Sequence, residues 1–141
     1  MASYIHRRQV TVEWGQCDPA GIVFNPRFFE MFDVSTWQLI QALLDVRQQD
    51  FPATYDVVGA PLVDARANFL KPARFGDTIE IASRITEVRR TSFDIEHRLT
   101  VGGELAVDGG ETRVWAVRDA ADADRIRAVA IPAGVVERFT A

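Results

Sequence analysis

The feature that most constrains the fold is a single change of hydrophobic periodicity along the chain. Residues 26–45 repeat apolar side chains at helical spacing, whereas most of the chain from residue 61 onward alternates with a period of two. One long helix followed by consecutive strands is typical of an α+β domain with a mostly antiparallel sheet. A chain of 141 residues can bury one hydrophobic core but is too short for two ordinary ones. We therefore expect a single domain over residues 1–141.

The predicted long helix has a clear start. Asn25 is a favoured N-cap residue, and Pro26 suits the first turn because its missing N–H would have no partner there. In projection, one broad face of residues 26–45 is apolar and carries Phe29, Phe32, Leu39, Ile40 and Leu43. A stripe of this width predicts that the helix is buried against a sheet.

Alternating segments predict the strands of that sheet. They lie at 10–14, 61–69, 78–90, 92–101, 104–108, 111–118 and 127–131. Gly102-Gly103 indicates a hairpin, and the run 108–110 indicates a turn between the two strands that follow. The piece near 54–59 is ambiguous, and Pro132 begins a C-terminal helical turn. Because one helix covers only one face of a sheet, the open face and unpaired edges predict a homo-oligomer.

Composition narrows the possible classes of function. A net charge of −4 argues against non-specific nucleic-acid binding. The single cysteine excludes an intramolecular disulfide and fits a reducing compartment. With no apolar leader segment and no stretch long enough for a membrane span, we expect a cytoplasmic protein without a membrane partner. Two histidines and one cysteine lack ligand spacing, so we expect no metal.

The stretch from Trp14 to Asp33 joins a strand end, a loop and the start of the helix. Asp18 lies in the loop, followed by Pro19 and Gly21, and by itself it could be only a turn residue. The free backbone N–H groups at a helix start can bind a carbonyl oxygen and stabilise an oxyanion. If Asp18 acts on the carbonyl carbon held there, the stretch predicts hydrolysis of an acyl compound.

Two chemical roles of Asp18 stay open. As a nucleophile it would form a mixed anhydride that water then cleaves, and as a general base it would deprotonate water. A rival nucleophile, Cys17, would need a histidine base, and the chain has only His6 and His97. His97 lies on the apolar side of its predicted strand, so we expect it to be packed in the core or at an interface.

Four segments carry a family likeness: CDPAGIVFNP at 17–26, GAPLV at 59–63, EVRRTSF at 87–93 and RIRAVAIPA at 125–133. They resemble the hotdog-fold acyl-coenzyme A (CoA) thioesterases, in particular the Pseudomonas-type 4-hydroxybenzoyl-CoA thioesterase family. The resemblance implies a central helix wrapped by a curved, mostly antiparallel sheet of five or six strands. It also implies a homodimer that assembles into a homotetramer, with active sites between subunits and no cofactor beyond the CoA of the substrate.

The resemblance also implies roles for individual residues. Asp18 is the catalytic acid, and the backbone N–H of Asn25 donates to the thioester carbonyl. The family carries tyrosine at the position of Asn25, a departure that changes the shape of the pocket and leaves the backbone donor intact. Asp33 recognises a ring hydroxyl, although by itself it would be a half-exposed helix acid. Phe24, at the end of the loop, is either a core residue or a pocket wall that contacts the acyl group, and the other candidate substrate contacts are Ala60 and Val63.

The candidates for binding the CoA phosphates are Arg89, Arg90 and Ser92. Arginine suits phosphate because its planar fork of donors binds two oxygens at once. The two arginines are adjacent on a predicted strand, so their side chains would point to opposite faces. Thr91 stands where the family often has lysine, so one basic contact is missing.

The expected reaction is hydrolysis of an acyl- or aroyl-CoA thioester, similar to 4-hydroxybenzoyl-CoA, to the free acid and CoA. A thioesterase for short-chain acyl-CoA, or for acyl groups on a carrier protein, would share this chemistry and differ in its pocket. A non-catalytic acyl-CoA binding domain is a third possibility. A hotdog dehydratase is disfavoured because residues 18–46 contain no histidine.

Overall fold

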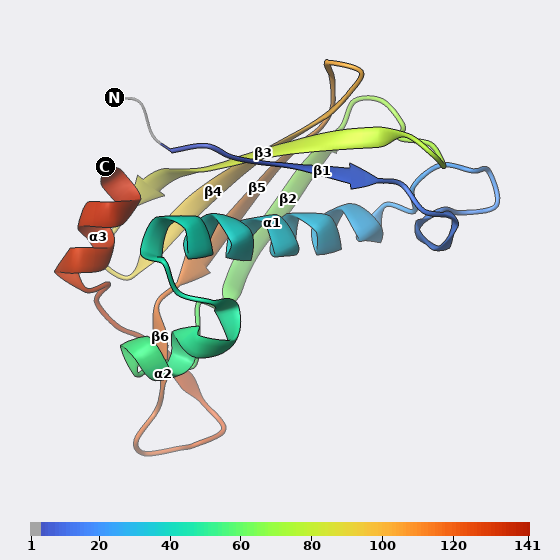
Figure 1. Ribbon diagram of the computed structural model, residues 1–141. Coiled ribbons are helices and arrows are strands. Elements are labelled where there is room, and N and C mark those ends of the chain that lie inside the picture. Colours follow the sequence, from blue (N-terminus) through green and yellow to red (C-terminus); the bar gives the residue numbers. More distant parts are fainter. Residues whose placement is uncertain (1–3) are drawn as a thin grey trace.

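In the computed structural model, which describes residues 4–141, one long helix lies against a five-stranded antiparallel sheet that curves around it (Figure 1). Residues 1–3 of the expected domain lie outside the described residues. The helix is α1 (Pro26–Leu44), and the strand order is β1-β3-β4-β5-β2. The strands are β1 (His6–Thr11), β2 (Leu62–Phe69), β3 (Thr78–Val88), β4 (Ser92–Val101) and β5 (Glu104–Val114). The predicted α+β fold class is confirmed, as is the start of the long helix at Pro26; the helix ends at Leu44, one residue before the predicted end.

Smaller elements close the end of the sheet that lies near the C-terminus of α1 (Figure 1). They are α2 (Phe51–Tyr55), β6 (Ala116–Arg118), β7 (Ile126–Ala128) and α3 (Ala133–Thr140), together with a 3-10 turn at Gln48–Asp50. A second 3-10 turn, Trp14–Gln16, lies at the opposite end, near the start of α1. The ring of Phe139 on α3 packs 5.0 Å from the ring of Phe93, between centroids. Among residues 4–141, no helix is long and apolar enough to cross a membrane.

The central strands bury the side chains that the alternation predicts. Ile79, Ile81 and Ile85 of β3 are buried, as are Phe93, Ile95, His97 and Leu99 of β4. They face α1, whereas the opposite face of these strands carries charged side chains such as those of Glu80, Arg84, Glu96 and Arg98. Strict alternation makes a strand easy to assign, because a shift of one residue would expose every apolar group.

The predicted apolar stripe of the long helix is only partly correct. The buried residues of α1 are Phe28, Met31, Phe32, Ser35, Thr36, Leu39, Ile40 and Leu44. Phe29, which the projection places on the buried face, is exposed. The buried face is rotated because the hydroxyl groups of Ser35 and Thr36 find polar partners beneath the helix, which a projection of hydrophobicity alone cannot predict.

The predicted turn at 108–110 is wrong, because β5 runs unbroken through Gly109 and Gly110. A Cβ atom added at Gly109 would lie 2.5 Å from Cε2 of Phe32 on α1, and one at Gly110 would lie 2.8 Å from the guanidinium of Arg66 on β2. Gly109 therefore allows the helix to approach the sheet closely. The glycine pair resembles a turn signal, but in this strand it makes room for the side chains of Phe32 and Arg66.

Other predicted boundaries also need correction. The strand predicted at 111–118 is divided between the end of β5 and β6, and the one predicted at 127–131 is β7, which ends at Ala128. The first strand ends at Thr11, and Trp14 begins a 3-10 turn instead of ending that strand. The ambiguous piece near 54–59 contains the end of α2. Arg89 and Arg90 lie in the turn between β3 and β4, after β3 has ended at Val88, so their side chains do not alternate across a strand as predicted.

The close approach at Gly109 predicts unequal effects for two neighbouring substitutions. In Gly109→Ala the new methyl group meets the ring of Phe32, which cannot easily move because it stacks on His97 with centroids 4.7 Å apart. Overpacking of this kind costs about 1–3 kcal/mol of the free energy of unfolding. Gly110→Ala meets only the exposed end of Arg66, so we expect a much smaller loss. Urea denaturation measures both, and equal losses would contradict this account.

Candidate active site

The loop that carries Asp18 is a tight hairpin leading into α1. Cys17 and Val23 form a bridge, and the Asp18 N–H donates to the carbonyl of Ile22 over 2.9 Å between N and O. The Gly21 N–H donates back to the carbonyl of Asp18, also at 2.9 Å. Gly21 has a φ of 79°, which favours glycine. The return arm of the hairpin runs directly into the first turn of the helix.

A second segment fixes this hairpin from the side. The Val23 N–H donates to the carbonyl of buried Ala73 at 2.9 Å, and the Phe75 N–H donates to the carbonyl of Gly21 at 3.0 Å. The rings of Trp14 and Phe75 pack edge to face, with centroids 5.4 Å apart. Backbone hydrogen bonds on both sides therefore determine the position of Asp18.

The Asp18 side chain is half-buried, and one of its two carboxylate oxygens accepts a hydrogen bond. Its Oδ1 atom accepts a hydrogen bond from the Ala20 N–H at 2.8 Å, which is the turn role that the sequence allowed. Its Oδ2 atom has no hydrogen-bond partner among residues 4–141. The thiol of Cys17 lies 3.6 Å from the carbonyl oxygen of Glu13, and within the described chain neither histidine bonds to it.

The start of α1 differs from a capped helix. Asn25 occupies the N-cap position with helical backbone angles, and its side chain makes no capping hydrogen bond, so the predicted side-chain cap is wrong. The first turn is closed instead by the Arg27 N–H donating to the Phe24 carbonyl at 2.8 Å. Over residues 4–141, no backbone carbonyl accepts from the Asn25 N–H. Pro26 begins the helix as predicted.

A cavity of about 260 Å³ lies at this end of the helix. Its lining residues are Ile22, Val23, Asn25, Phe28, Phe69, Leu70, Lys71 and Pro72. The lining is mostly apolar and brings Asn25 together with Ile22, the backbone partner of Asp18. Phe24, predicted as a pocket wall, is 52% exposed and does not line this cavity.

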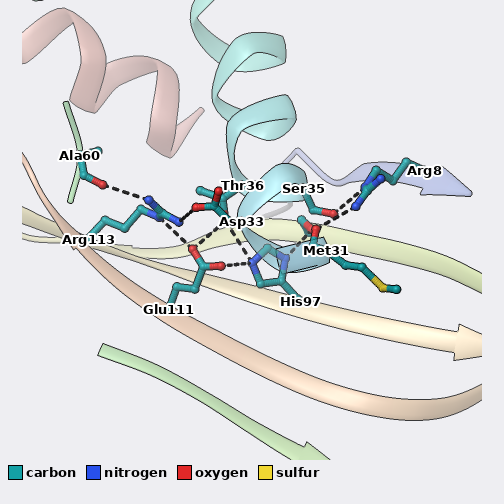
Figure 2. Close-up of polar contacts among 10 residues, drawn as sticks. Arg8, Met31, Asp33, Ser35, Thr36, Ala60, His97, Glu111 and Arg113 are labelled. Atoms are coloured by element: carbon teal, nitrogen blue, oxygen red, sulfur yellow. Dashed lines mark hydrogen bonds and ion pairs between the residues drawn. The ribbon is translucent and has the colours of Figure 1, made fainter. Parts of the chain in front are cut away.

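The structure joins two predicted substrate contacts, Asp33 and Ala60, through the buried side chain of Arg113 (Figure 2). The Nη2 atom of Arg113 donates to Oδ1 of Asp33 at 2.6 Å, and its Nη1 atom donates to the carbonyl of Ala60 at 3.1 Å. The side chain of Asp33 is 54% exposed, whereas that of Arg113 is 4% exposed. Val63 lies apart from this group, 58% exposed on β2.

Arg113 belongs to a larger buried network under α1. Its Nε atom donates to Oε1 of Glu111 at 2.8 Å, and Glu111 also accepts from the Thr36 hydroxyl at 2.8 Å and lies 3.0 Å from Nε2 of His97. Burial alone would raise the pKa of Glu111, but the hydrogen bond from His97 and the charge of Arg113 outweigh it and hold that pKa below its usual value. His97 was predicted to lie in the core or at an interface, and the structure places it in the core.

Glu111 and Arg113 are the residues that sequence reasoning missed. Both lie on the inward face of β5, with Val107 and Gly109 before them and Trp115 after them at the same alternation. Two opposite charges spaced by two residues on an otherwise apolar face were the available signal.

The predicted phosphate contacts form a closed cluster in the β3–β4 turn. Arg89 donates to both carboxylate oxygens of Asp94, with Nη1 3.0 Å from Oδ2, and its Nε atom donates to the hydroxyl of Ser92 at 2.9 Å. The hydrogen bond between Arg89 and Asp94 raises the pKa of Arg89 and lowers that of Asp94. Arg90 is exposed, and its side chain has no ion pair within residues 4–141.

Comparisons with known proteins agree with this architecture. Residues 12–139 match the family model of the thioesterase-like superfamily. The chain is 35% identical over 135 residues to the 4-hydroxybenzoyl-CoA thioesterase of Pseudomonas sp. (strain CBS-3), an alignment that covers 92% of this chain and 93% of the relative.

Solved structures of 4-hydroxybenzoyl-CoA thioesterase share the fold. The enzyme from the same Pseudomonas strain superposes with a TM-score of 0.87 at 29% identity, covering 97% of this chain and 99% of that one. An aspartate-to-asparagine mutant in complex with 4-hydroxybenzoyl-CoA gives a TM-score of 0.87 at 28% identity, covering 96% and 98%. The chain therefore belongs to the thioesterase-like superfamily, and its long helix wrapped by an antiparallel sheet is the hotdog fold.

Proposed function

We propose that this protein hydrolyses an acyl- or aroyl-CoA thioester, similar to 4-hydroxybenzoyl-CoA, to the free acid and CoA. The observation that carries the proposal is the arrangement at the start of α1. There, Asp18 lies on a loop held by backbone hydrogen bonds, its backbone partner Ile22 lines an apolar cavity, and the N–H of Asn25 at the same cavity has no backbone acceptor among residues 4–141. The named activity of the Pseudomonas relative supports the same reaction.

In the proposed reaction the thioester carbonyl oxygen accepts from the Asn25 N–H, aided by the positive end of the α1 dipole. As a nucleophile, Asp18 forms a bond to the carbonyl carbon while the C–S bond breaks, and water then cleaves the mixed anhydride. As a base, Asp18 takes a proton from the water that attacks the same carbon. Either route gives the carboxylic acid and the CoA thiol. The aspartate mutation in the relative's substrate complex supports an aspartate in the reaction.

The size of the cavity favours a compact acyl group. About 260 Å³ lies just below the roughly 300–1,000 Å³ typical of pockets for drug-sized ligands, so an aromatic ring fits better than a long alkyl chain. Asp33 follows Pro26 by two helical turns, about 10 Å along the axis at 1.5 Å per residue. Asp33 does not line the cavity, so the ring is proposed to extend from the helix start along α1, with its carbonyl at Asn25 and its distal hydroxyl at Asp33. Phe24, Ala60 and Val63 do not line this cavity and are proposed to contact the substrate outside it.

The CoA portion is proposed to lie near the β3–β4 turn. Arg90 offers an unpaired guanidinium to a phosphate, and Arg89 and Ser92 beside it complete the donor set. The reaction needs no cofactor, and the single cysteine suits the reducing cytoplasm.

We also propose that the protein is a homodimer, with two dimers forming a tetramer. Within residues 4–141, β2 pairs only with β5, which leaves its other edge open. Exposed apolar side chains gather on this strand and just after it: Leu62, Val63, Phe69 and Leu70. An exposed apolar edge of this kind is suited to pairing with the same strand of a second copy across a two-fold axis.

The catalytic proposal predicts that Asp18→Asn lowers kcat for thiol release by about 10³-fold or more, because the attacking or proton-accepting oxygen is lost. The fold and the affinity for CoA should be unchanged. Asp119→Asn is a matched control, since Asp119 accepts from the N–H two residues later in the same way as Asp18.

The measurement is release of free thiol from 4-hydroxybenzoyl-, benzoyl-, phenylacetyl- and acetyl-CoA and from an acylated carrier protein. Retention of more than a tenth of the activity in Asp18→Asn would refute the role of Asp18. A wild-type protein that binds these thioesters without releasing thiol would be a binding module instead.

The dimer proposal predicts that Val63→Glu shifts the protein toward a monomer, because two like charges would meet across the open edge of β2. Ile126→Glu on β7 is the control, since Ile126 is similarly exposed at 50% and lies away from that edge. Sedimentation velocity over a concentration series measures the mass. A wild-type monomer, or an unchanged dimer in Val63→Glu, would rule out this interface.

A further inference from the structure

We infer that Arg113 is a positioning residue that aims the carboxylate of Asp33 at a hydroxyl group on the substrate ring. It would thereby set the preference for hydroxylated over unsubstituted aroyl groups. This inference rests on the proposed function and deepens it, since Arg113 is buried beneath the helix and need not touch the substrate. Three properties of the network shown in Figure 2 support this role of Arg113.

The first property is that the guanidinium of Arg113 is fixed on every side. Each of its three nitrogen atoms donates to a different residue: Nε to Glu111, Nη1 to Ala60 and Nη2 to Asp33. Its Cζ atom also lies 5.9 Å from the centroid of the Trp37 ring. A planar fork held in this way has one orientation, and the direction of its Nη2–H bond is therefore defined.

The second property is the order in which charges are neutralised. Glu111 is only 4% exposed, so its negative charge needs the positive charge of Arg113 more than the exposed carboxylate of Asp33 does. Asp33 lies at the exposed end of the same arginine and is held by a single hydrogen bond to its Oδ1 atom. Its Oδ2 atom has no partner among residues 4–141. That oxygen can only accept, so the group it recognises must be a donor such as a phenolic hydroxyl.

The third property is that the network ties α1 to β5 at two points. Thr36 lies three residues after Asp33 on the same helix, and its hydroxyl donates to the Oε1 atom of Glu111 that also accepts from Arg113. The helix therefore cannot slide along β5 without breaking both contacts. Since Asn25 and Asp33 belong to this one helix, the network fixes both the carbonyl end and the hydroxyl end of the proposed ring site.

The test uses Arg113→Lys, which keeps a positive charge beside Glu111 but cannot donate in a planar fork to three groups. We compare kcat/KM for 4-hydroxybenzoyl-CoA and benzoyl-CoA in the wild type, Arg113→Lys, Asp33→Asn and the double variant. A hydrogen bond to a charged group corresponds to about 10- to 100-fold in selectivity. We expect Arg113→Lys to lose most of the ratio of kcat/KM for 4-hydroxybenzoyl-CoA to kcat/KM for benzoyl-CoA. The loss should come from a lower kcat/KM for the hydroxylated substrate, with the value for benzoyl-CoA unchanged.

In the Asp33→Asn background, Arg113→Lys should change the ratio no further, because Arg113 acts through Asp33. Arg66→Lys is the matched control, an arginine paired with Asp64 on the neighbouring strand β2, with its guanidinium over Gly110. If circular dichroism shows that Arg113→Lys does not fold, the pair Glu111→Gln with Arg113→Gln replaces it, since it leaves no unpaired buried charge.

A wild type without preference for the hydroxylated substrate would overturn the inference, as would an Arg113→Lys variant that lowers both substrates equally. In those cases thiol release still stands, and Arg113 is a structural ion-pair residue. Failure of the wild type to release thiol from either substrate would instead refute the proposed function.

Discussion

The rest of the structure depends on one buried ion pair, formed by Glu111 and Arg113 beneath α1. Moving the two charges out of water is unfavourable by several kcal/mol for each. The buried pair is therefore stable only where the remaining donors of Arg113 and the oxygen atoms of Glu111 also have hydrogen-bond partners. Thr36, His97, Ala60 and Asp33 supply these partners from α1, β4 and the loop before β2. The register of the helix on the sheet is therefore set by polar contacts, and apolar packing fills the space around them.

Sequence reasoning predicted the elements whose pattern is local. Pro26 marks the helix start, and the inward residues of β3 and β4 follow from strict alternation. It failed at Gly109-Gly110, where a turn signal and a close approach by Phe32 have the same sequence appearance. It also left Ser35 and Thr36 out of the predicted buried face, because their burial depends on partners that are distant in the chain.

The same distinction applies to the candidate site. Asp18 and Asn25 are close in sequence, so the family resemblance was enough to predict that the loop leads into the helix start. The hydrogen bonds that hold the loop come from Ala73 and Phe75, which are distant in the chain and could not be predicted. Arg113 could not be assigned to Asp33 without knowing how β5 lies under α1. The pairing of Arg89 with Asp94 likewise depends on the register of the β3–β4 hairpin, which the two predicted strands did not define.

The two glycines within β5 also affect how the molecule opens. Glycine in a strand interior is less favourable than alanine by about 0.5–1 kcal/mol, so β5 is intrinsically a weak strand. The ring of Phe32 covers Gly109, and the helix seals the ion pair beside it. If α1 lifted away, it would expose bare backbone in the sheet and two charges without their helical partners. Helix and sheet should therefore exchange their amide hydrogens as one cooperative unit, and not as separate layers.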